Sequence, residues 1–220
     1  MLNKTKIPWA DYTINPVKGL CPMACPYCYA RRIYKRFGWS ETIQWNEQCL
    51  IDLKRIKKPS RIFIGSTMEL FGEWVGDNAI EHIFDHLRDY PQHTFIFLTK
   101  QPQNLAKWSF PPNCWVGVSA TDHFMWDEAL RSLERIDASV KFVSLEPLMG
   151  HISMDYPYSP KILNWLILGS QTPMSEKTLP KREWVDEIIS AADKASIPVF
   201  CKEPMASHYG INRKEFPRGC

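Results

Sequence analysis

Short apolar runs alternate with longer amphipathic segments along most of the chain. Runs rich in β-branched and aromatic residues predict strands at 12–14, 61–65, 94–98, 115–118, 141–144, 165–168 and 198–200. Helical periodicity predicts helices over 29–37, 47–56, 78–90, 125–135 and 182–194, and 155–160 is expected to be a surface loop. Such alternation favours a parallel sheet with helices outside it. The pattern predicts an α/β fold, a partial or near-complete parallel (β/α) barrel of six to seven strands.

The segment 78–90 shows how the pattern is read. One apolar stripe falls at helical spacing, and it consists of Ile80, Ile83, Phe84 and Leu87. Asn78 is expected to cap the start of this helix, because its side chain can accept a hydrogen bond from a free backbone N–H group.

Length and composition fit one domain spanning residues 1–220. Apolar residues make up 45% and charged residues 23%, and no apolar run is long enough to cross a membrane. Residues 1–6 lack the apolar core of a secretion signal, so a cytoplasmic protein is expected. Unpaired thiols also fit a reducing compartment.

The net charge is only +3, but the basic residues are unevenly distributed. They form two stretches: Arg31, Arg32, Lys35 and Arg36, and then Lys54, Arg55, Lys57, Lys58 and Arg61. The simpler interpretation is two solvated helix faces. The alternative is a phosphate-rich substrate that binds nearby.

Three of the seven cysteines lie close together, at Cys21, Cys25 and Cys28. Pro22 and Pro26 disfavour a helix through them, so we expect the chain to wrap around a ligand as a loop. Iron–sulfur clusters with four irons usually have four cysteine ligands. Three cysteines would leave one iron open to a small molecule, as an open position does in catalytic metal sites.

Other interpretations of these thiols remain open. A structural zinc site needs a fourth ligand, such as Cys49 or a histidine, and no second Cys-x-x-Cys pair exists. A disulfide with one spare thiol is a second alternative. A thioredoxin-like redox pair formed by Cys25 and Cys28 is a third, but it leaves Cys21 unexplained.

Polar residues follow nearly every predicted strand. Because the carboxyl ends of parallel barrel strands converge on one mouth, these residues are candidates for an active site. Long charged side chains at a barrel mouth need partners or a ligand, which singles out Lys100, Glu146 and Lys202. We assign Glu146, Gln171 and Lys202 to substrate binding and catalysis, although a structural Lys202–Glu146 ion pair is an equal alternative.

The cysteine spacing resembles the cluster loop of the radical S-adenosylmethionine (radical SAM) superfamily. The residues around it are similar to a group of short, largely uncharacterised radical SAM-like proteins encoded by phages and prokaryotes. The similar segments are Trp9…Thr13-Ile14-Asn15-Pro16…Gly19-Leu20, Tyr29-Ala30-Arg31, Ser144-Leu145-Glu146-Pro147-Leu148 and Phe216-Pro217.

The resemblance implies a [4Fe–4S] cluster on Cys21, Cys25 and Cys28, with S-adenosylmethionine on the fourth iron. Tyr27, before the third cysteine, would lie against the adenine. The resemblance also implies an incomplete TIM-like barrel of about six core strands and an electron donor such as flavodoxin or ferredoxin.

In this superfamily a Gly-Gly-Glu-like segment after the second strand receives the amino group of S-adenosylmethionine. The corresponding stretch here is Gly65-Ser66-Thr67-Met68-Glu69, which departs from the two glycines. Ser66, Thr67 and Glu69 are the candidates, since their oxygens accept hydrogen bonds from an ammonium group. Three further cofactor-binding candidates follow the next strands: Thr99, Lys100 and Ser119.

Two functional hypotheses result. The first is a radical SAM enzyme that cleaves S-adenosylmethionine and abstracts hydrogen from a substrate such as a nucleotide, a nucleic-acid base or a peptide. The basic stretches favour modification or repair of a nucleotide or nucleic acid. The second is a zinc- or redox-dependent nucleic-acid-binding module without catalytic activity.

Overall fold

The computed structural model describes residues 3–154 and 162–217; the expected surface loop at 155–160 lies outside these ranges. Its main sheet has eight strands, in the order β1-β2-β5-β6-β7-β8-β9-β10. Seven of them are parallel, and the edge strand β1 (Asn3–Lys4) runs antiparallel to β2. The parallel strands are β2 (Tyr12–Ile14), β5 (Arg61–Ile64), β6 (Thr94–Thr99), β7 (Cys114–Ser119), β8 (Val140–Leu145), β9 (Trp165–Leu168) and β10 (Val199–Cys201).

The parallel strands follow one another in chain order, as in a (β/α) barrel, but the sheet stays open, with β1 and β10 at its two edges. The predicted half-barrel is therefore confirmed, and each predicted strand is present. The sequence pattern missed β1 and a small second sheet of β3 (Val17–Lys18) and β4 (Gln44–Trp45). Each of these strands is two residues long, which is too short to show an alternating pattern.

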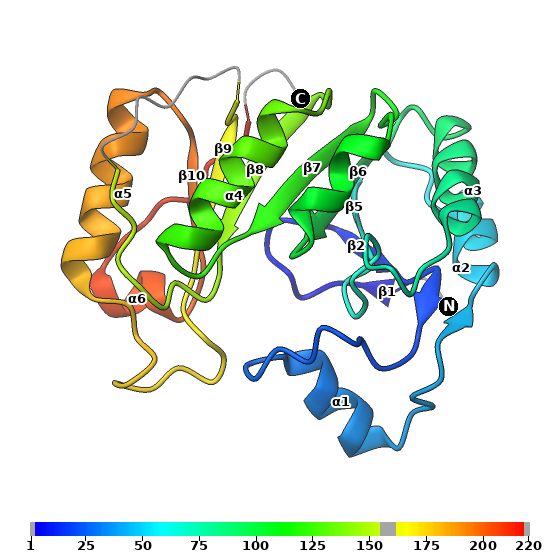
Figure 1. Ribbon diagram of the computed structural model, residues 1–220, viewed down its shortest axis with the longest axis horizontal. Coiled ribbons are helices and arrows are strands. Elements are labelled where there is room, and N and C mark those ends of the chain that lie inside the picture. The colour runs from blue at the N-terminus through cyan, green and yellow to red at the C-terminus, as the bar shows by residue number, and fades with distance from the viewer. Residues whose placement is uncertain (1–2, 155–161, 218–220) are drawn as a thin grey trace.

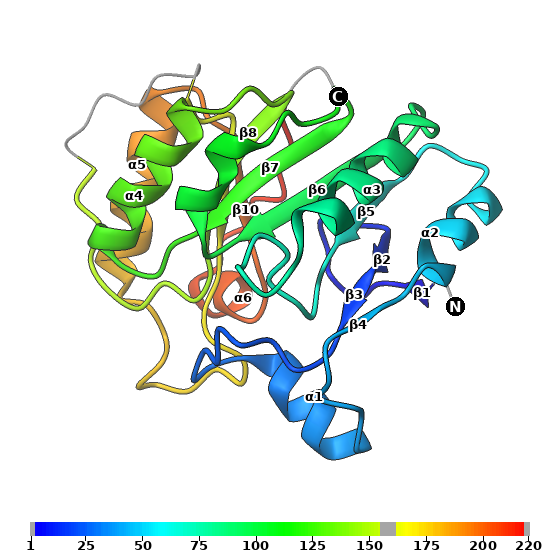
Figure 2. The ribbon, with the colours of Figure 1, turned by 45° about the vertical axis from the view of Figure 1, so that its right-hand side comes forward.

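Helices cover the outer face of the sheet, whereas α1 lies apart from it at one end (Figures 1 and 2). The helices are α1 (Tyr29–Phe37), α2 (Gln48–Ile51), α3 (Asp77–Arg88), α4 (His123–Glu134), α5 (Arg182–Lys194) and α6 (Met205–Tyr209). Two 3-10 helices, η1 (Asp52–Arg55) and η2 (Pro102–Lys107), complete the set. No helix among the described residues is both long and apolar enough to cross a membrane.

Local capping explains where the helices begin and end. The prediction of Asn78 as the cap of α3 was wrong, because Gly76 occupies the N-cap position. For α4, the carboxylate of Asp122 accepts a hydrogen bond from the backbone N–H of Met125 at 3.0 Å, which fixes the first turn. Gly38 ends α1 with φ of 59°, a left-handed conformation that glycine adopts without strain.

The two faces of the sheet bury different cores. The outer core joins the strands to α3, α4 and α5. The inner core fills the concave side and is largely aromatic, with Trp9, Phe63, Trp115, Phe142, Trp165 and Phe200 among its members. A Cβ at Gly117 would lie 2.3 Å from the ring of Phe142, so only glycine there lets that ring cross the barrel interior.

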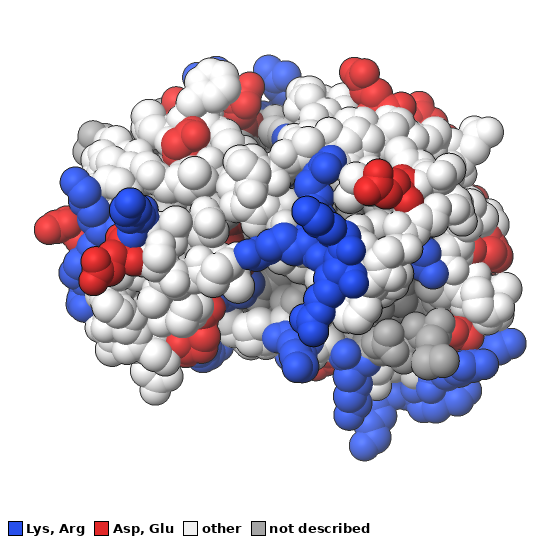
Figure 3. Space-filling view, turned by 90° about the horizontal axis from the view of Figure 1, so that it is seen from below, with Lys and Arg blue, Asp and Glu red and all other residues white. Residues whose placement is uncertain are grey.

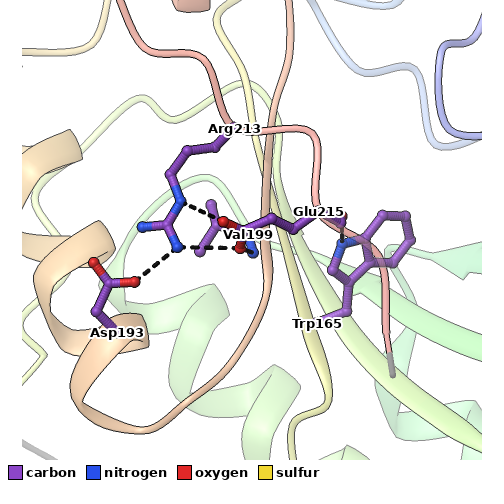
Figure 4. A network of polar contacts seen from close by, with 5 residues as sticks. All are labelled: Trp165, Asp193, Val199, Arg213 and Glu215. Carbon is purple, nitrogen blue, oxygen red and sulfur yellow. Dashed lines mark hydrogen bonds and ion pairs between the residues drawn. The ribbon is translucent and has the colours of Figure 1, made fainter. Parts of the chain in front are cut away.

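The C-terminal segment closes the end of the barrel where the strands begin. Phe216 stacks on Trp165 with ring centroids 5.5 Å apart. Glu215 accepts hydrogen bonds from Trp165 Nε1 and from the backbone N–H of Val199, each at 2.8 Å (Figure 4). Arg213 joins Glu215 to Asp193 of α5, with contacts of 2.9 and 2.7 Å (Figure 4). Access to the barrel interior is therefore left at the carboxyl ends of the strands.

Candidate functional site

Strand alternation brings the predicted site residues to one mouth. Alternate residues of a strand share a face, and Phe142 of β8 lies in the inner core. Ser144 therefore faces inward above it, and Glu146 follows at the rim. The same reasoning from Ile96, Ile167 and Phe200 points Lys100, Gly169 and Lys202 toward the interior. The mouth is thus lined by polar residues, and the aromatic inner core lies directly beneath it.

The cysteine loop is a pair of turns that ends at α1. The backbone N–H of Ala24 donates to Cys21 O at 3.4 Å, and that of Cys28 donates to Cys25 O at 3.1 Å. Ala24 has φ of 49°, an uncommon left-handed conformation for a residue with a Cβ. Arg31 Nη2 donates to Cys21 O at 2.9 Å, which ties the start of the loop to α1.

The three loop thiols are free and half-buried. Burial raises the pKa of the Cys21 thiol, while hydrogen bonds from the backbone at Glu69 and Met23 lower it. Backbone N–H groups beside a sulfur are the kind of contact that tunes an iron–sulfur cluster. Among residues 3–154 and 162–217, no three His, Cys, Asp or Glu side chains are grouped to hold one metal ion. The loop thus offers three free thiols with backbone N–H groups nearby, and thiolates in such surroundings are the ligands that iron–sulfur clusters take.

Asn15 organises the segment after β5, a role that the sequence analysis missed. Its Oδ1 accepts hydrogen bonds from both the backbone N–H and the hydroxyl of Thr67, each at 3.1 Å. The Ser66 hydroxyl lies 3.3 Å from Asn15 Nδ2 and 3.4 Å from Asn15 Oδ1, so both atoms of the amide group are within hydrogen-bonding distance of it. The Tyr29 hydroxyl donates to Ser66 O at 2.6 Å, so α1 is anchored to this segment. Ser66 and Thr67, two of the predicted cofactor-binding residues, thus lie directly beside the cysteine loop.

Glu69 is buried and ties the ends of β5 and β6 together. Its carboxylate accepts hydrogen bonds from the Thr99 hydroxyl at 2.6 Å, the backbone N–H of Lys100 at 2.7 Å and that of Phe71 at 3.1 Å. Burial raises the pKa of Glu69, and these hydrogen bonds oppose the shift. The structure therefore brings Glu69, Thr99 and Lys100 into one group, with Glu69 and Thr99 engaged with each other.

The Lys100 ammonium lies 5.5 Å from the centre of the Tyr27 ring. Burial lowers the pKa of Lys100, whereas the charges of Cys25, Glu69 and Glu146 raise it. Lys100 therefore lies beside Tyr27 of the cysteine loop, within the electrostatic influence of Glu146 on the opposite wall of the mouth. Burial also raises the pKa of Tyr27.

Across the mouth, Lys202 Nζ donates a hydrogen bond to Glu146 Oε1. The side chains of Lys202 and Glu146 are 18% and 24% exposed, so the ion pair is largely buried. Gly169 lies beneath it, and a Cβ there would come within 3.2 Å of Glu146 Cγ. The predicted pair is thus present, and glycine provides the space that it occupies.

The remaining predicted residues are less connected. Gln171 is half-buried and makes no hydrogen bond to another described residue. Ser119 is buried on β7, paired in register with Ser144. The hydroxyls of Ser144 and Ser170 are buried without a hydrogen-bond partner in the described part of the chain. Ser144 was not among the predicted site residues, although its inward position follows from strand alternation with Phe142.

A family model described as "Protein of unknown function (DUF5131)" matches residues 4–212. The chain belongs to this family. An uncharacterized protein of Methanocaldococcus jannaschii is 37% identical to this chain over 75 residues. That alignment covers 32% of this chain and 28% of the archaeal protein, so the match spans less than a third of either protein.

The DUF5131 chain has the radical SAM half-barrel fold of spore photoproduct lyase. One mutant of that enzyme aligns with a TM-score of 0.57 at 12% identity, covering 92% of this chain and 79% of the enzyme. A mutant with bound AdoMet and dinucleoside spore photoproduct aligns with a TM-score of 0.51 at 11% identity, covering 88% and 64%. A further complex with dinucleoside spore photoproduct gives 0.52 at 11% identity, covering 91% and 78%. At these identities the likeness shows the fold of the DUF5131 chain and not its substrate.

Proposed function

We propose that this protein is a radical SAM enzyme that abstracts hydrogen from a nucleotide or nucleic-acid base. The observation that carries the proposal is a loop of three free thiols, Cys21, Cys25 and Cys28, at the mouth of a half-barrel with the fold of a radical SAM enzyme. These thiolates would hold a [4Fe–4S] cluster. When bound, the cluster supplies the electron that splits S-adenosylmethionine and generates the hydrogen-abstracting 5′-deoxyadenosyl radical.

The chain's own residues bind and orient the cofactor in this proposal. Tyr27 lies against the adenine, and the Lys100 ammonium offsets the methionine carboxylate. Ser66 and Thr67 receive the amino group through oxygens that Asn15 positions. Glu69 and Thr99 act indirectly, by positioning Lys100: Glu69 accepts a hydrogen bond from the Lys100 backbone N–H and another from the Thr99 hydroxyl. Ser119 provides a hydroxyl for the ribose or carboxylate.

Substrate would occupy the opposite wall. Glu146, Lys202 and Gln171 offer an acceptor, a cation and an amide at the rim. The unpartnered Ser144 hydroxyl lies below them and can hydrogen-bond a polar edge that enters the mouth. A nucleotide or base presents such donors and acceptors. The complexes of spore photoproduct lyase with dinucleoside spore photoproduct support this substrate class for a protein of the same fold.

The test is anaerobic reconstitution with iron and sulfide, followed by dithionite and S-adenosylmethionine, with dithionite replacing a flavodoxin or ferredoxin donor. We expect a brown protein with about four irons per chain, and release of 5′-deoxyadenosine. Cys25→Ala should lose the cluster, whereas Cys49→Ala, a buried thiol outside the loop, should retain it. A colourless protein with one bound zinc would contradict the proposal and favour a zinc-dependent nucleic-acid-binding module. A Cys25→Ala variant with a full cluster would contradict the role of Cys25 as a ligand.

A further inference from the structure

Helix α1 carries an uncompensated positive charge. It has four basic residues among nine and no acidic residue. Arg31 turns inward to Cys21 O, whereas Arg32, Lys35 and Arg36 are exposed. None of these four residues takes part in an ion pair with another described residue, whereas Lys107, Arg182 and Lys214 each have a carboxylate partner within 4.0 Å. The helix therefore presents cations that have no carboxylate partner among the described residues.

Two exposed aromatic rings continue this surface at the end of α1. Phe37 and Trp39 are 59% and 50% exposed, and they stack with centroids 5.6 Å apart and an interplanar angle of 23°. Trp39 also meets the buried Tyr34 ring edge-on at 5.3 Å, which holds its indole in place. The Arg36 guanidinium lies 5.4 Å from the Phe37 ring centre. A fixed flat ring next to free cations is therefore open to solvent.

This surface adjoins the mouth of the barrel. Tyr29 at the start of α1 contacts the segment after β5, and Arg32 Nη2 donates to Thr172 O in the segment after β9. Seen from that end of the molecule, Lys and Arg side chains form a band across the middle of the face, beside a hollow (Figure 3). A ligand that binds along α1 would thus lead into the proposed active site.

We infer that the exposed face of α1, together with the Phe37–Trp39 stack, binds a single strand of DNA whose target nucleotide enters the mouth. This inference rests on the proposed function and assigns the surface that holds its substrate. Lys35 and Arg36 pair with backbone phosphates, because basic side chains supply most of the affinity for nucleic acid. Trp39 stacks on an unpaired base, which accounts for a flat ring left in water.

Two other partners share part of this chemistry and fit the surface less well. A helix that lies on a membrane needs a free apolar face, but Ala30 and Tyr34 of α1 are buried against the chain itself. An acidic electron-donor protein would use the same cations, but it does not require stacked rings of the kind formed by Phe37 and Trp39. A nucleic-acid strand uses both features.

Binding of a fluorescent single strand of about 15 nucleotides, within the site sizes known for such surfaces, tests the inference on the reconstituted protein. We expect Lys35→Ala/Arg36→Ala to weaken binding at least tenfold and to reduce the slope of log affinity against log salt by about 1.4, or 0.7 for each phosphate. Trp39→Ala should weaken binding about tenfold with the slope unchanged. The matched control is Lys57→Ala/Lys58→Ala, which removes the same charge from another exposed segment and should change affinity less than threefold.

Release of 5′-deoxyadenosine without substrate separates this inference from the proposed function. It should be unchanged in Lys35→Ala/Arg36→Ala, because neither residue touches the mouth. If neither the wild-type protein nor any variant releases 5′-deoxyadenosine, but DNA binding still depends on Lys35, Arg36 and Trp39, then the enzyme proposal fails and the proposed binding surface remains supported. Equal weakening by the two charge-removing variants would overturn the inference. Binding of anionic vesicles without binding of DNA would also overturn it, because the partner would then be a membrane. A loss of activity in Lys35→Ala/Arg36→Ala that is seen only when flavodoxin supplies the electrons would overturn it too, because the partner would then be the electron donor.

Discussion

Lys202 and Glu146 form an ion pair across the barrel mouth, between residues that follow two strands separated by β9. Burial lowers the pKa of Lys100, and the charge of Glu146 is among those that oppose this shift. Glu146 therefore interacts electrostatically with two lysines, Lys202 and Lys100. A carboxylate in this position both compensates their charge and remains available to a ligand.

Glu146→Gln tests whether this pair acts on substrate. The change keeps the shape but leaves the Lys202 ammonium without a counter-charge, so we expect a loss of about 1–3 kcal/mol in the free energy of unfolding. Turnover stimulated by substrate should fall at least tenfold, while substrate-free release of 5′-deoxyadenosine stays within twofold. If Glu146→Gln/Lys202→Met recovers both stability and turnover, the pair is structural only.

Gly169→Ala should disturb the same pair from below. A Cβ there would lie 3.2 and 3.4 Å from Glu146 Cγ and Cδ, and 3.5 Å from Lys202 Cβ, so the carboxylate must shift. We expect substrate-stimulated turnover to fall about tenfold with a stability change below about 1 kcal/mol. Gly150→Ala is the control, since its Cβ would meet its nearest neighbour, Asp122 Cβ, at 3.4 Å. Wild-type turnover in Gly169→Ala would show that the position of Glu146 does not matter.

The contact between Gly117 and Phe142 predicts a strongly coupled pair in the inner core. Gly117→Ala would place a Cβ 2.3 Å from the Phe142 ring, so overpacking should cost about 1–3 kcal/mol in urea unfolding. Phe142→Leu should also destabilise, through the cavity that it leaves. Because the smaller side chain makes room for the new methyl group, the double variant should lose less than the sum of the two single losses. Additivity within about 0.5 kcal/mol would refute this packing.

His93 should make stability depend on pH. It is 1% exposed, and burial lowers its pKa while a backbone hydrogen bond at Ile56 raises it. Below an unfolded-state pKa of about 6.5 the unfolded chain binds the proton more readily, so stability falls as the solution is acidified through this value. The slope attributable to this one site cannot exceed about 1.4 kcal/mol per pH unit. Urea unfolding between pH 5 and 7 should show a smaller slope in His93→Gln than in the exposed control His208→Gln; equal slopes would exclude His93 as the cause.

The half-barrel could be predicted from sequence because its strands are apolar and its outer helices are amphipathic. α5 begins and ends where the pattern placed it. The position of Lys100, Glu146 and Lys202 at one mouth also followed from the order of strands. The loop of Cys21, Cys25 and Cys28 was evident from spacing, and Tyr29 continues into a helix as expected.

Contacts between distant segments could not be predicted in this way. Nothing in the local sequence shows that both oxygens of Glu69 accept hydrogen bonds from residues thirty positions away, or that Asn15 holds Thr67. The stack of Phe37 on Trp39 depends on the left-handed turn at Gly38, which a helical pattern does not contain. Side-chain partners of this kind are set by tertiary geometry.

The segment 213–217 contacts both the edge strand β10 and the aromatic inner core. Lys214 forms a β-bridge with Phe200 along the outer edge of β10, while Phe216 stacks on Trp165 and covers the aromatic inner core. Loss of the residues after 212 would uncover a strand edge and the indole ring of Trp165 together, although it would leave Cys21, Cys25 and Cys28 in place. A chain truncated in this way would retain every residue of the proposed site and yet be prone to aggregate through the uncovered strand edge.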